Sequence, residues 1–270
     1  MESSMARRRK RFLTEPTEER QPAGTSWSPD HPKVLETLAV AKVVQCRPIM
    51  WGSNGTFLVT LDGGEELGQS HAVYKPRRGE APLWDFPHGT LHRREVATFL
   101  VSECLGWSLV PATVIRDGPF GVGSVQLFIE HDPANYFSAP AKRDREASQQ
   151  IALLDVVLNN ADRKAEHCIQ DLAGRTWAID HGLTFHVEPK LRTVIWDFAG
   201  DRIRQDLLDD LENLRQAFED PGSLRSALCG LVTQNEVDAV YRRLKWLLRN
   251  RIYPDPGKDR RASPWANWWP

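Results

Sequence analysis

Residues 158–182 read LNNADRKAEHCIQDLAGRTWAIDHG, and the fold prediction starts from this stretch. It places Asp162, a basic pair and His167 close together and then reaches Asp180 in an Asp-His-Gly triplet after a short hairpin. A polar loop followed by a tight turn would explain either half alone. Catalytic loops of kinases carry an Asp and, five residues later, a metal-binding Asn, and a second metal-binding Asp precedes a Gly. The stretch therefore predicts phosphoryl transfer if the rest of the chain supplies an ATP site.

Three features upstream fit such an ATP site, although each is weak alone. A turn between two predicted strands reads GSNG, and glycine turns leave backbone N–H groups free to bind phosphates. Lys75 ends a predicted strand, where a buried ammonium needs an anion, although an edge Lys that reaches solvent is the simpler explanation. Glu95 lies on the next predicted helix and can reach Lys75 if that helix packs on the sheet. The residues of the turn are Gly52, Ser53, Asn54 and Gly55.

The periodicity of apolar residues changes half-way along the chain. Short alternating segments predict strands in the first half, with one helix at 92–106. The second half favours helices, at 144–160, at 206–218 and from Thr233, where Glu236 three residues later completes a capping-box pattern. The strand candidates are 39–47, 56–62, 71–76, 110–116 and 122–130. This order predicts an α+β, two-lobed protein-kinase-like fold with a sheet-rich N-lobe and a helical C-lobe.

The order of the polar features strengthens the prediction of ATP binding. The glycine turn, the strand Lys, the helix Glu and the two acidic motifs follow one another on the elements expected in a kinase. Asp162 would then orient or deprotonate the nucleophile, and Lys164 would meet the γ-phosphate. His167 and Asp180 would hold the Mg²⁺ or Mn²⁺ ions that bridge the phosphates of ATP.

The composition excludes several classes of protein. The chain has 270 residues, of which 41% are hydrophobic, and a formal net charge of -1. This length suits one two-lobed domain or two small ones, and the charge gives no electrostatic basis for nucleic-acid binding. No apolar run approaches the roughly 20 residues of a membrane span, so we expect no transmembrane segment. The four Cys are scattered without a C-x-x-C pair, which favours reduced thiols and a cytoplasmic location.

The two ends of the chain differ from the part between them. Residues 1–32 are rich in charge, Pro and Ser and are predicted to form a disordered basic tail. The kinase-like domain is predicted at 33–253, with the N-lobe at about 33–131 and the C-lobe at about 140–253. Residues 254–270 form a tail that ends in PWANWWP. Its three Trp predict either an anchor that packs on the domain or a site for a partner.

Two motifs resemble those of a known superfamily. The segments LNNADRKAEHCI and AIDHGLTFH resemble the catalytic and metal-binding motifs of phosphatidylinositol 3-/4-kinase-related families, which write Asn-x-Asp-Arg-His-x-x-Asn and Asp-x-Gly. The likeness is closest to small bacterial members, with HipA-type Ser/Thr kinases as cousins, and covers roughly residues 45–250.

The resemblance implies a role for each matching residue. Lys75 would contact the α- and β-phosphates of ATP, and Glu95 would position Lys75. Asp162 would be the catalytic base, with His167 and Asp180 as metal ligands. The implied adenine hinge consists of Phe128, Ile129 and Glu130.

Two positions depart from the family pattern. Lys164 stands where the family has His, which moves the γ-phosphate contact from an imidazole to an ammonium. His167 replaces the metal-binding Asn, which puts the second metal site in question. After Asp180 only Lys190 and Arg192 are nearby cations, whereas an inositol-phosphate headgroup would attract more.

Four functions follow from these features. The leading prediction is an ATP- and metal-dependent phosphotransferase that acts on a hydroxyl of a protein or small molecule. A kinase fold that binds ATP in the inverted orientation would transfer AMP instead. The two departures also allow a nucleotide-binding regulator without activity, although a regulator need not keep Lys75, Asp162 and Asp180. A pure interaction module built on the C-terminal Trp cluster would leave the acidic positions unexplained.

Overall fold

The first half of the chain forms an antiparallel sheet. The computed structural model describes residues 26–49, 54–132, 144–220 and 224–256. Within them five strands pair in the order β1-β2-β3-β5-β4, and every pair is antiparallel. The strands are β1 (Lys42–Ile49), β2 (Thr56–Asp62), β3 (Gln69–Pro76), β4 (Thr113–Gly118) and β5 (Gly121–Leu127). The helix α1 (Val34–Val40) precedes the sheet, and the single-turn α2 (Gly64–Leu67) joins β2 to β3.

One helix connects the sheet with the helical lobe. The helix α3 (Leu91–Cys104) follows β3 after the short η1 (Arg77–Gly79), and it contacts β4 and β5 as well as two helices of the second half. Ten of its fourteen residues are buried, among them the charged Arg94 and Glu95. A helix enclosed on most sides cannot leave these charges in water, so each must find a partner inside the protein.

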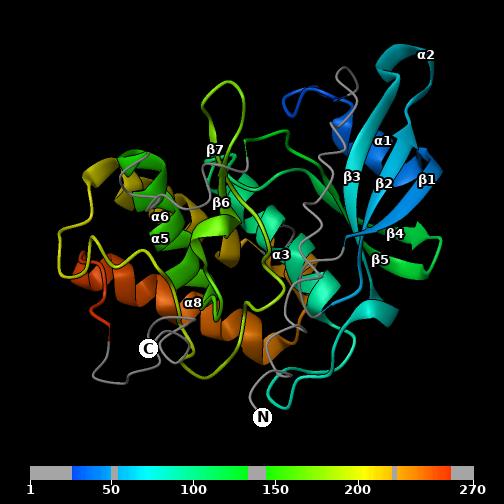
Figure 1. Ribbon diagram of the computed structural model, residues 1–270. Coiled ribbons are helices and arrows are strands. Elements are labelled where there is room, and N and C mark those ends of the chain that lie inside the picture. The colour runs from blue at the N-terminus through cyan, green and yellow to red at the C-terminus, as the bar shows by residue number, and fades with distance from the viewer. Residues whose placement is uncertain (1–25, 50–53, 133–143, 221–223, 257–270) are drawn as a thin grey trace, which may run out of the picture.

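The second half is helical, as the sequence predicts. The helices are α5 (Arg145–Leu158), α6 (Gln205–Glu219), α7 (Leu224–Cys229) and α8 (Gln234–Asn250). The capping box at Thr233 and Glu236 is confirmed, because both of its reciprocal hydrogen bonds form. The predicted hairpin is confirmed as the antiparallel pair of β6 (Cys168–Gln170) and β7 (Thr176–Ala178), and the short 3-10 helix η3 (Ala165–His167) precedes it. In Figure 1 the sheet lies on the right, α5, α6 and α8 lie on the left, and α3 lies between them.

A continuous apolar core runs through both lobes. It includes Leu61 and Leu127 of the sheet together with Leu154 on α5 and Leu244 on α8, all at most 1% exposed. Because the sheet and the helices share this core, the two-lobed α+β prediction is confirmed. The strand predicted at 39–47 lies further along the chain, since Val40 ends α1 and β1 runs from Lys42 to Ile49.

The packed part of the chain begins before the predicted domain boundary. Trp27 falls within the 1–32 segment, yet it is 2% exposed and belongs to the core. Its indole N–H donates to the Gly68 carbonyl at 3.2 Å, and its backbone N–H donates to the Ser70 hydroxyl at 3.1 Å. The basic run near the N-terminus and the Trp-rich PWANWWP segment both lie outside the described residues.

Replacement of Trp27 tests whether this segment is part of the folded domain. We expect Trp27→Ala to lower the free energy of unfolding by about 3–5 kcal/mol, because it leaves a large cavity in the core. Denaturant titration measures the change. Trp84→Ala is the matched control, since Trp84 is 90% exposed and its loss should alter stability little. Equal stability of the two variants would contradict the prediction.

Candidate active site

Lys75, Glu95 and Asp180 meet between the two lobes. The Lys75 ammonium contacts the Glu95 carboxylate and donates to Asp180 Oδ1 at 2.8 Å, although Lys75 and Asp180 are 105 residues apart in sequence. Lys75 lies on β3, where every second residue, including Ala72 and Tyr74, is buried on the opposite face. The sequence prediction that Glu95 reaches back to Lys75 therefore matches the geometry.

The charges in this trio stabilise one another. Burial lowers the pKa of the Lys75 ammonium, but the carboxylates of Asp180 and Glu95 outweigh that effect, so this pKa is raised overall. Burial raises the pKa of Asp180, but the ammonium of Lys75 outweighs it, so the Asp180 pKa lies well below its usual range. The Asp180 side chain is nevertheless 49% exposed, which leaves its carboxylate open to a ligand.

Two Asn residues shape the loop that carries Asp162. Asn159 ends α5 in the left-handed conformation, with φ 55°, and its side-chain amide donates to the carbonyls of His186 and Glu188. The Asn160 amide donates to Asp155 at 2.8 Å, and its side-chain oxygen accepts the backbone N–H of Asp162 at 3.0 Å. The two Asn therefore determine where the chain turns out of the helix and how Asp162 enters the site.

Arg163 binds this loop to α5 from the buried side. Its guanidinium is fully buried and pairs with Asp155 on α5 at 3.0 Å. It also donates to the carbonyls of His167 at 3.2 Å and Ile179 at 2.9 Å, and contacts His181 Nε2 at 2.7 Å. These acceptors come from both acidic motifs, so Arg163 holds the two motifs at a fixed separation.

Asp162 and Lys164 form a second, partly exposed pair. Lys164 Nζ lies 3.0 Å from Asp162 Oδ2, with both side chains between 20% and 29% exposed. Burial raises the pKa of the Asp162 carboxyl, and the ammonium of Lys164 offsets this only in part. A carboxylate with a raised pKa is a stronger base than an ordinary Asp, which suits proton transfer from a hydroxyl.

His167 and Asp180 provide the best candidate ligands for a metal ion. His167 Nε2 lies 3.3 Å from Asp180 Oδ2, and His167 Nδ1 lies 3.0 Å from the backbone oxygen of Asp162. A carbonyl can only accept, so Nδ1 carries the ring proton in this contact. Burial lowers the pKa of His167 and thus favours the neutral ring. The lone pair of Nε2 then faces a carboxylate oxygen, and a cation shared by the two would relieve their repulsion.

This donor set fits a metal held together with a nucleotide. Metal-binding His residues commonly donate their other ring N–H to a backbone carbonyl, as His167 does. Among the described residues, no group of three or more His, Cys, Asp and Glu side chains is placed to hold an ion. Mg²⁺ and Mn²⁺ in phosphotransfer sites take one or two protein ligands and complete their shell with phosphate oxygens and water. His167 and Asp180 could therefore hold such an ion, which would neutralise negative charge on the phosphates.

The predicted phosphate turn is only partly described. Gly52 and Ser53 lie outside the described residues. The Asn54 side chain accepts the N–H of Ala81 at 2.7 Å, and the N–H of Gly55 donates to the Gly79 carbonyl at 2.8 Å. A phosphate-binding turn would leave its N–H groups free, but that of Gly55 is occupied because the turn packs against the chain after β3.

The predicted hinge directly follows β5. Phe128 donates its backbone N–H to the His71 carbonyl at 3.1 Å, and the Ile129 carbonyl accepts from the His131 ring at 2.6 Å. Ile129 is buried, whereas Glu130 is partly exposed. The chain leaves the sheet here, and His131 then pairs with Asp171 in an isolated antiparallel bridge.

Sequence reasoning missed the buried residues that support the site. Asp155 and Arg163 had no assigned role, and neither did His181, whose backbone N–H donates to Glu95 at 2.9 Å. One signal was present, since Asp155 interrupts the apolar run IALLDVVL on α5. A charge in an apolar helix face needs a buried partner, and Arg163 is that partner.

Comparison with known proteins identifies a family. No family model matches the chain. Protein Rv2133c of Mycobacterium tuberculosis is 38% identical over 248 residues, which are 79% of this chain and 87% of that protein. The chain belongs to the family of Protein Rv2133c.

Solved structures show that the fold is kinase-like. The Golgi casein kinase with Mn/ADP bound aligns with a TM-score of 0.52 and 17% identity, over 80% of this chain and 74% of that one. The hydra Fam20 structure with sugar aligns with a TM-score of 0.50 and 15% identity, over 81% of this chain and 88% of that one. At this identity the comparison concerns the fold alone. In the described parts of the chain, no helix is long and apolar enough to cross a membrane.

The His167–Asp180 pair leads to a prediction about metal preference. Imidazole is a softer ligand than an amide oxygen, so we expect the protein with bound ATP to prefer Mn²⁺ to Mg²⁺. His167→Asn should shift that preference toward Mg²⁺. Electron paramagnetic resonance of bound Mn²⁺, titrated with Mg²⁺, measures it. His186→Asn is the matched control, because His186 bonds the Asp85 carbonyl instead. Identical competition curves for wild type and His167→Asn would exclude the imidazole as a ligand.

Proposed function

We propose that the chain is an ATP- and divalent-metal-dependent phosphotransferase that transfers the γ-phosphate to a hydroxyl of a protein or small molecule. The observation that carries the proposal is the contact of Lys75 with both Glu95 and Asp180. These three residues come from a strand, a helix and a loop, and they meet beside Asp162 on a kinase-like fold. A structural ion pair would need only two of them, whereas phosphate and metal binding use all three.

Each residue has a role that its position supports. Lys75, with its ammonium fixed between two carboxylates, binds the α- and β-phosphates, and Glu95 positions it. Asp162 accepts the proton of the acceptor hydroxyl, which its raised pKa favours. Lys164, beside Asp162, neutralises charge that develops on the transferred phosphate. His167 and Asp180 hold the ion, and the segment of Phe128, Ile129 and Glu130 receives the adenine.

The comparisons support the cofactors of this proposal. The related Golgi casein kinase structure contains Mn/ADP, and Mn²⁺ agrees with an imidazole in the ligand set. The finer resemblance to phosphatidylinositol 3-/4-kinase-related and HipA-type families is part of the proposal and rests on the two motifs. We also place the domain at 33–253 with an extension to Trp27. All four Cys lie in described parts of the chain and none of them forms a disulfide bond there, in keeping with a cytoplasmic location.

The segment after Asp180 offers few cations that could bind a lipid headgroup. Lys190 is paired with Asp85 at 2.9 Å and is only 11% exposed, so one of the two nearby cations is already neutralised. An inositol-phosphate headgroup requires several free cations. A protein or small-molecule hydroxyl is therefore the preferred acceptor. A partner at the C-terminal Trp cluster remains a separate proposal, because that segment lies outside the described residues.

Transfer of labelled phosphate tests the reaction directly. The protein is incubated with Mn²⁺ and ATP labelled at either the α or the γ position, with a lysate fraction as acceptor source, and products are identified by mass spectrometry. We expect transfer of the γ label. Transfer of the α label would indicate AMP transfer, and binding of ATP without any transfer would indicate a regulator.

The same assay tests the role of Asp162. Asp162→Asn should reduce transfer by a factor of about 10²–10⁴ and leave ATP affinity nearly unchanged, because the amide cannot accept the hydroxyl proton. Asp209→Asn on the exposed side of α6 is the matched control. Near-normal turnover of Asp162→Asn would remove Asp162 from this role.

Calorimetric titration with ATP separates the roles of Lys75 and Asp180. Lys75→Ala should weaken binding with or without metal, because its ammonium contacts phosphate directly. Asp180→Ala should weaken binding only when Mg²⁺ or Mn²⁺ is present, because its carboxylate acts through the ion. An unchanged affinity of Asp180→Ala in the presence of metal would contradict the metal role.

A further inference from the structure

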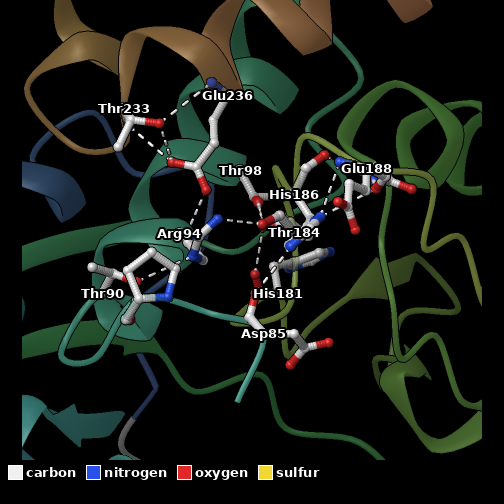
Figure 2. A network of polar contacts seen from close by, with 12 residues as sticks. Asp85, Thr90, Arg94, Thr98, His181, Thr184, His186, Glu188, Thr233 and Glu236 are labelled. Atoms are coloured by element: carbon white, nitrogen blue, oxygen red, sulfur yellow. Dashed lines mark hydrogen bonds and ion pairs between the residues drawn. The ribbon is translucent and has the colours of Figure 1, made fainter. Parts of the chain in front are cut away.

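Two neighbouring residues of α3 connect the two lobes. Glu95 contacts Lys75 of the sheet and accepts the backbone N–H of His181. Arg94 donates to Glu236 Oε1 and to the Thr184 carbonyl, each at 2.6 Å. Figure 2 shows Arg94 between Glu236 on one side and the 181–184 turn on the other. Arg94, the residue before Glu95, therefore binds α3 to the helical lobe.

The guanidinium of Arg94 has a partner at each nitrogen. Its Nη1 and Nη2 donate to Thr184 and Glu236, as described above, and its Nε donates to the Thr90 hydroxyl at 3.3 Å. Its plane lies over the ring of Phe86, 5.0 Å from the centroid. Arg94 is 1% exposed, so none of these contacts competes with solvent. A planar cation with directed hydrogen bonds fixes the rotation of a helix better than apolar packing does.

Glu236 links Arg94 to the start of α8. One carboxylate oxygen binds Arg94, and the other accepts the backbone N–H and the hydroxyl of Thr233, each at 2.9 Å. The capping box that begins α8 therefore also binds α3 (Figure 2). Arg94 and Glu236 are 142 residues apart in sequence, so this pair joins the two halves of the chain.

The turn that follows Asp180 is bound by the same helix. The Thr184 hydroxyl donates to the His181 carbonyl at 2.7 Å and lies 3.3 Å from the hydroxyl of Thr98, one helical turn beyond Arg94. Arg94, Glu95 and Thr98 thus contact both ends of the 181–184 turn. The orientation of Asp180 and that of Glu95 are consequently set together.

We propose that Arg94 is a positioning residue that keeps Glu95 paired with Lys75, by fixing α3 to Glu236 and to the 181–184 turn. A rotation of α3 away from the sheet would separate Glu95 from Lys75 and leave the buried Glu95 carboxylate without its cation, which is strongly unfavourable. The Lys75–Glu95 pair is therefore assembled without a separate activation step. This proposal rests on the proposed function, because Glu95 matters for catalysis only if Lys75 binds phosphate.

A matched set of variants separates positioning from stability. Arg94→Met with Glu236→Gln removes both charges at once, so no ion is stranded, and Gln retains the capping box. Thr233→Ala is the control, because it weakens the start of α8 and leaves the contact between Arg94 and Glu236. Glu95→Gln, alone and with the Arg94→Met/Glu236→Gln pair, tests whether Arg94 acts through Glu95.

The first measurement is amide hydrogen exchange and requires no nucleotide. We expect the His181 amide and the amides of α3 to exchange about tenfold faster in the Arg94→Met/Glu236→Gln protein, since charged hydrogen bonds typically contribute at least that factor. Exchange in Thr233→Ala should match wild type at His181. Unchanged exchange in the double variant, or equal acceleration in Thr233→Ala, would overturn the proposal.

The second measurement is the affinity for ATP with Mn²⁺. The double variant should lose about tenfold in affinity, and it should lose nothing further when combined with Glu95→Gln, because the two changes act through one contact. Additive losses would overturn the positioning role. If wild type itself did not bind ATP, the proposed function would fail, and the exchange result alone would decide whether Arg94 positions Glu95.

Discussion

The buried ion pair between Asp155 and Arg163 is the constraint on which the site depends. Arg163 has no access to water, so each of its donors must be satisfied by the protein. Its partners are the Asp155 carboxylate, the carbonyls of His167 and Ile179, and the His181 ring. Because the carbonyls belong to the two segments that carry the acidic motifs, satisfying one cation sets the distance between those motifs.

The charges of the site fall into two groups that differ in exposure. The pairs Asp155–Arg163 and Arg94–Glu236 are closed, since all four side chains are at most 6% exposed. Lys75, Asp162, Lys164 and Asp180 are each between 20% and 49% exposed. The first group holds the backbone in place at a cost in desolvation that good geometry offsets. In the proposed function, the second group exchanges its mutual contacts for contacts with phosphate and metal, and the closed pairs hold these residues in position during the exchange.

The sequence predicts those features that depend on local pattern. Apolar spacing predicted α5, α6 and α8. The capping residues Thr233 and Glu236 also predicted the residue at which α8 begins. The meeting of Lys75 and Glu95 followed from the order of strand and helix. The packing of Trp27 was not predictable, because a single Trp in a polar segment has no period.

Pairings between buried charges that lie far apart in the sequence could not be predicted from it either. Arg94 lies in HRREVATF, where three basic residues in a row resemble a solvated helix face. Nothing local distinguishes Arg94 from Arg93, which is exposed. The partner Glu236 already had a complete local explanation in the capping box. Its second role depends on the packing of α3 against α8, and packing is a property of the whole fold.

In the proposed site, His167 can supply the two functions that the resembling families obtain from an Asn at this position. An Asn side chain offers one acceptor for a metal and one N–H donor for the backbone. The neutral imidazole offers the same pair, with Nδ1 on the Asp162 carbonyl and Nε2 toward Asp180. A regulator without catalytic activity requires neither of these two functions. Together with the closed ion pairs beneath it, this equivalence favours a working phosphotransfer site over a degenerate one.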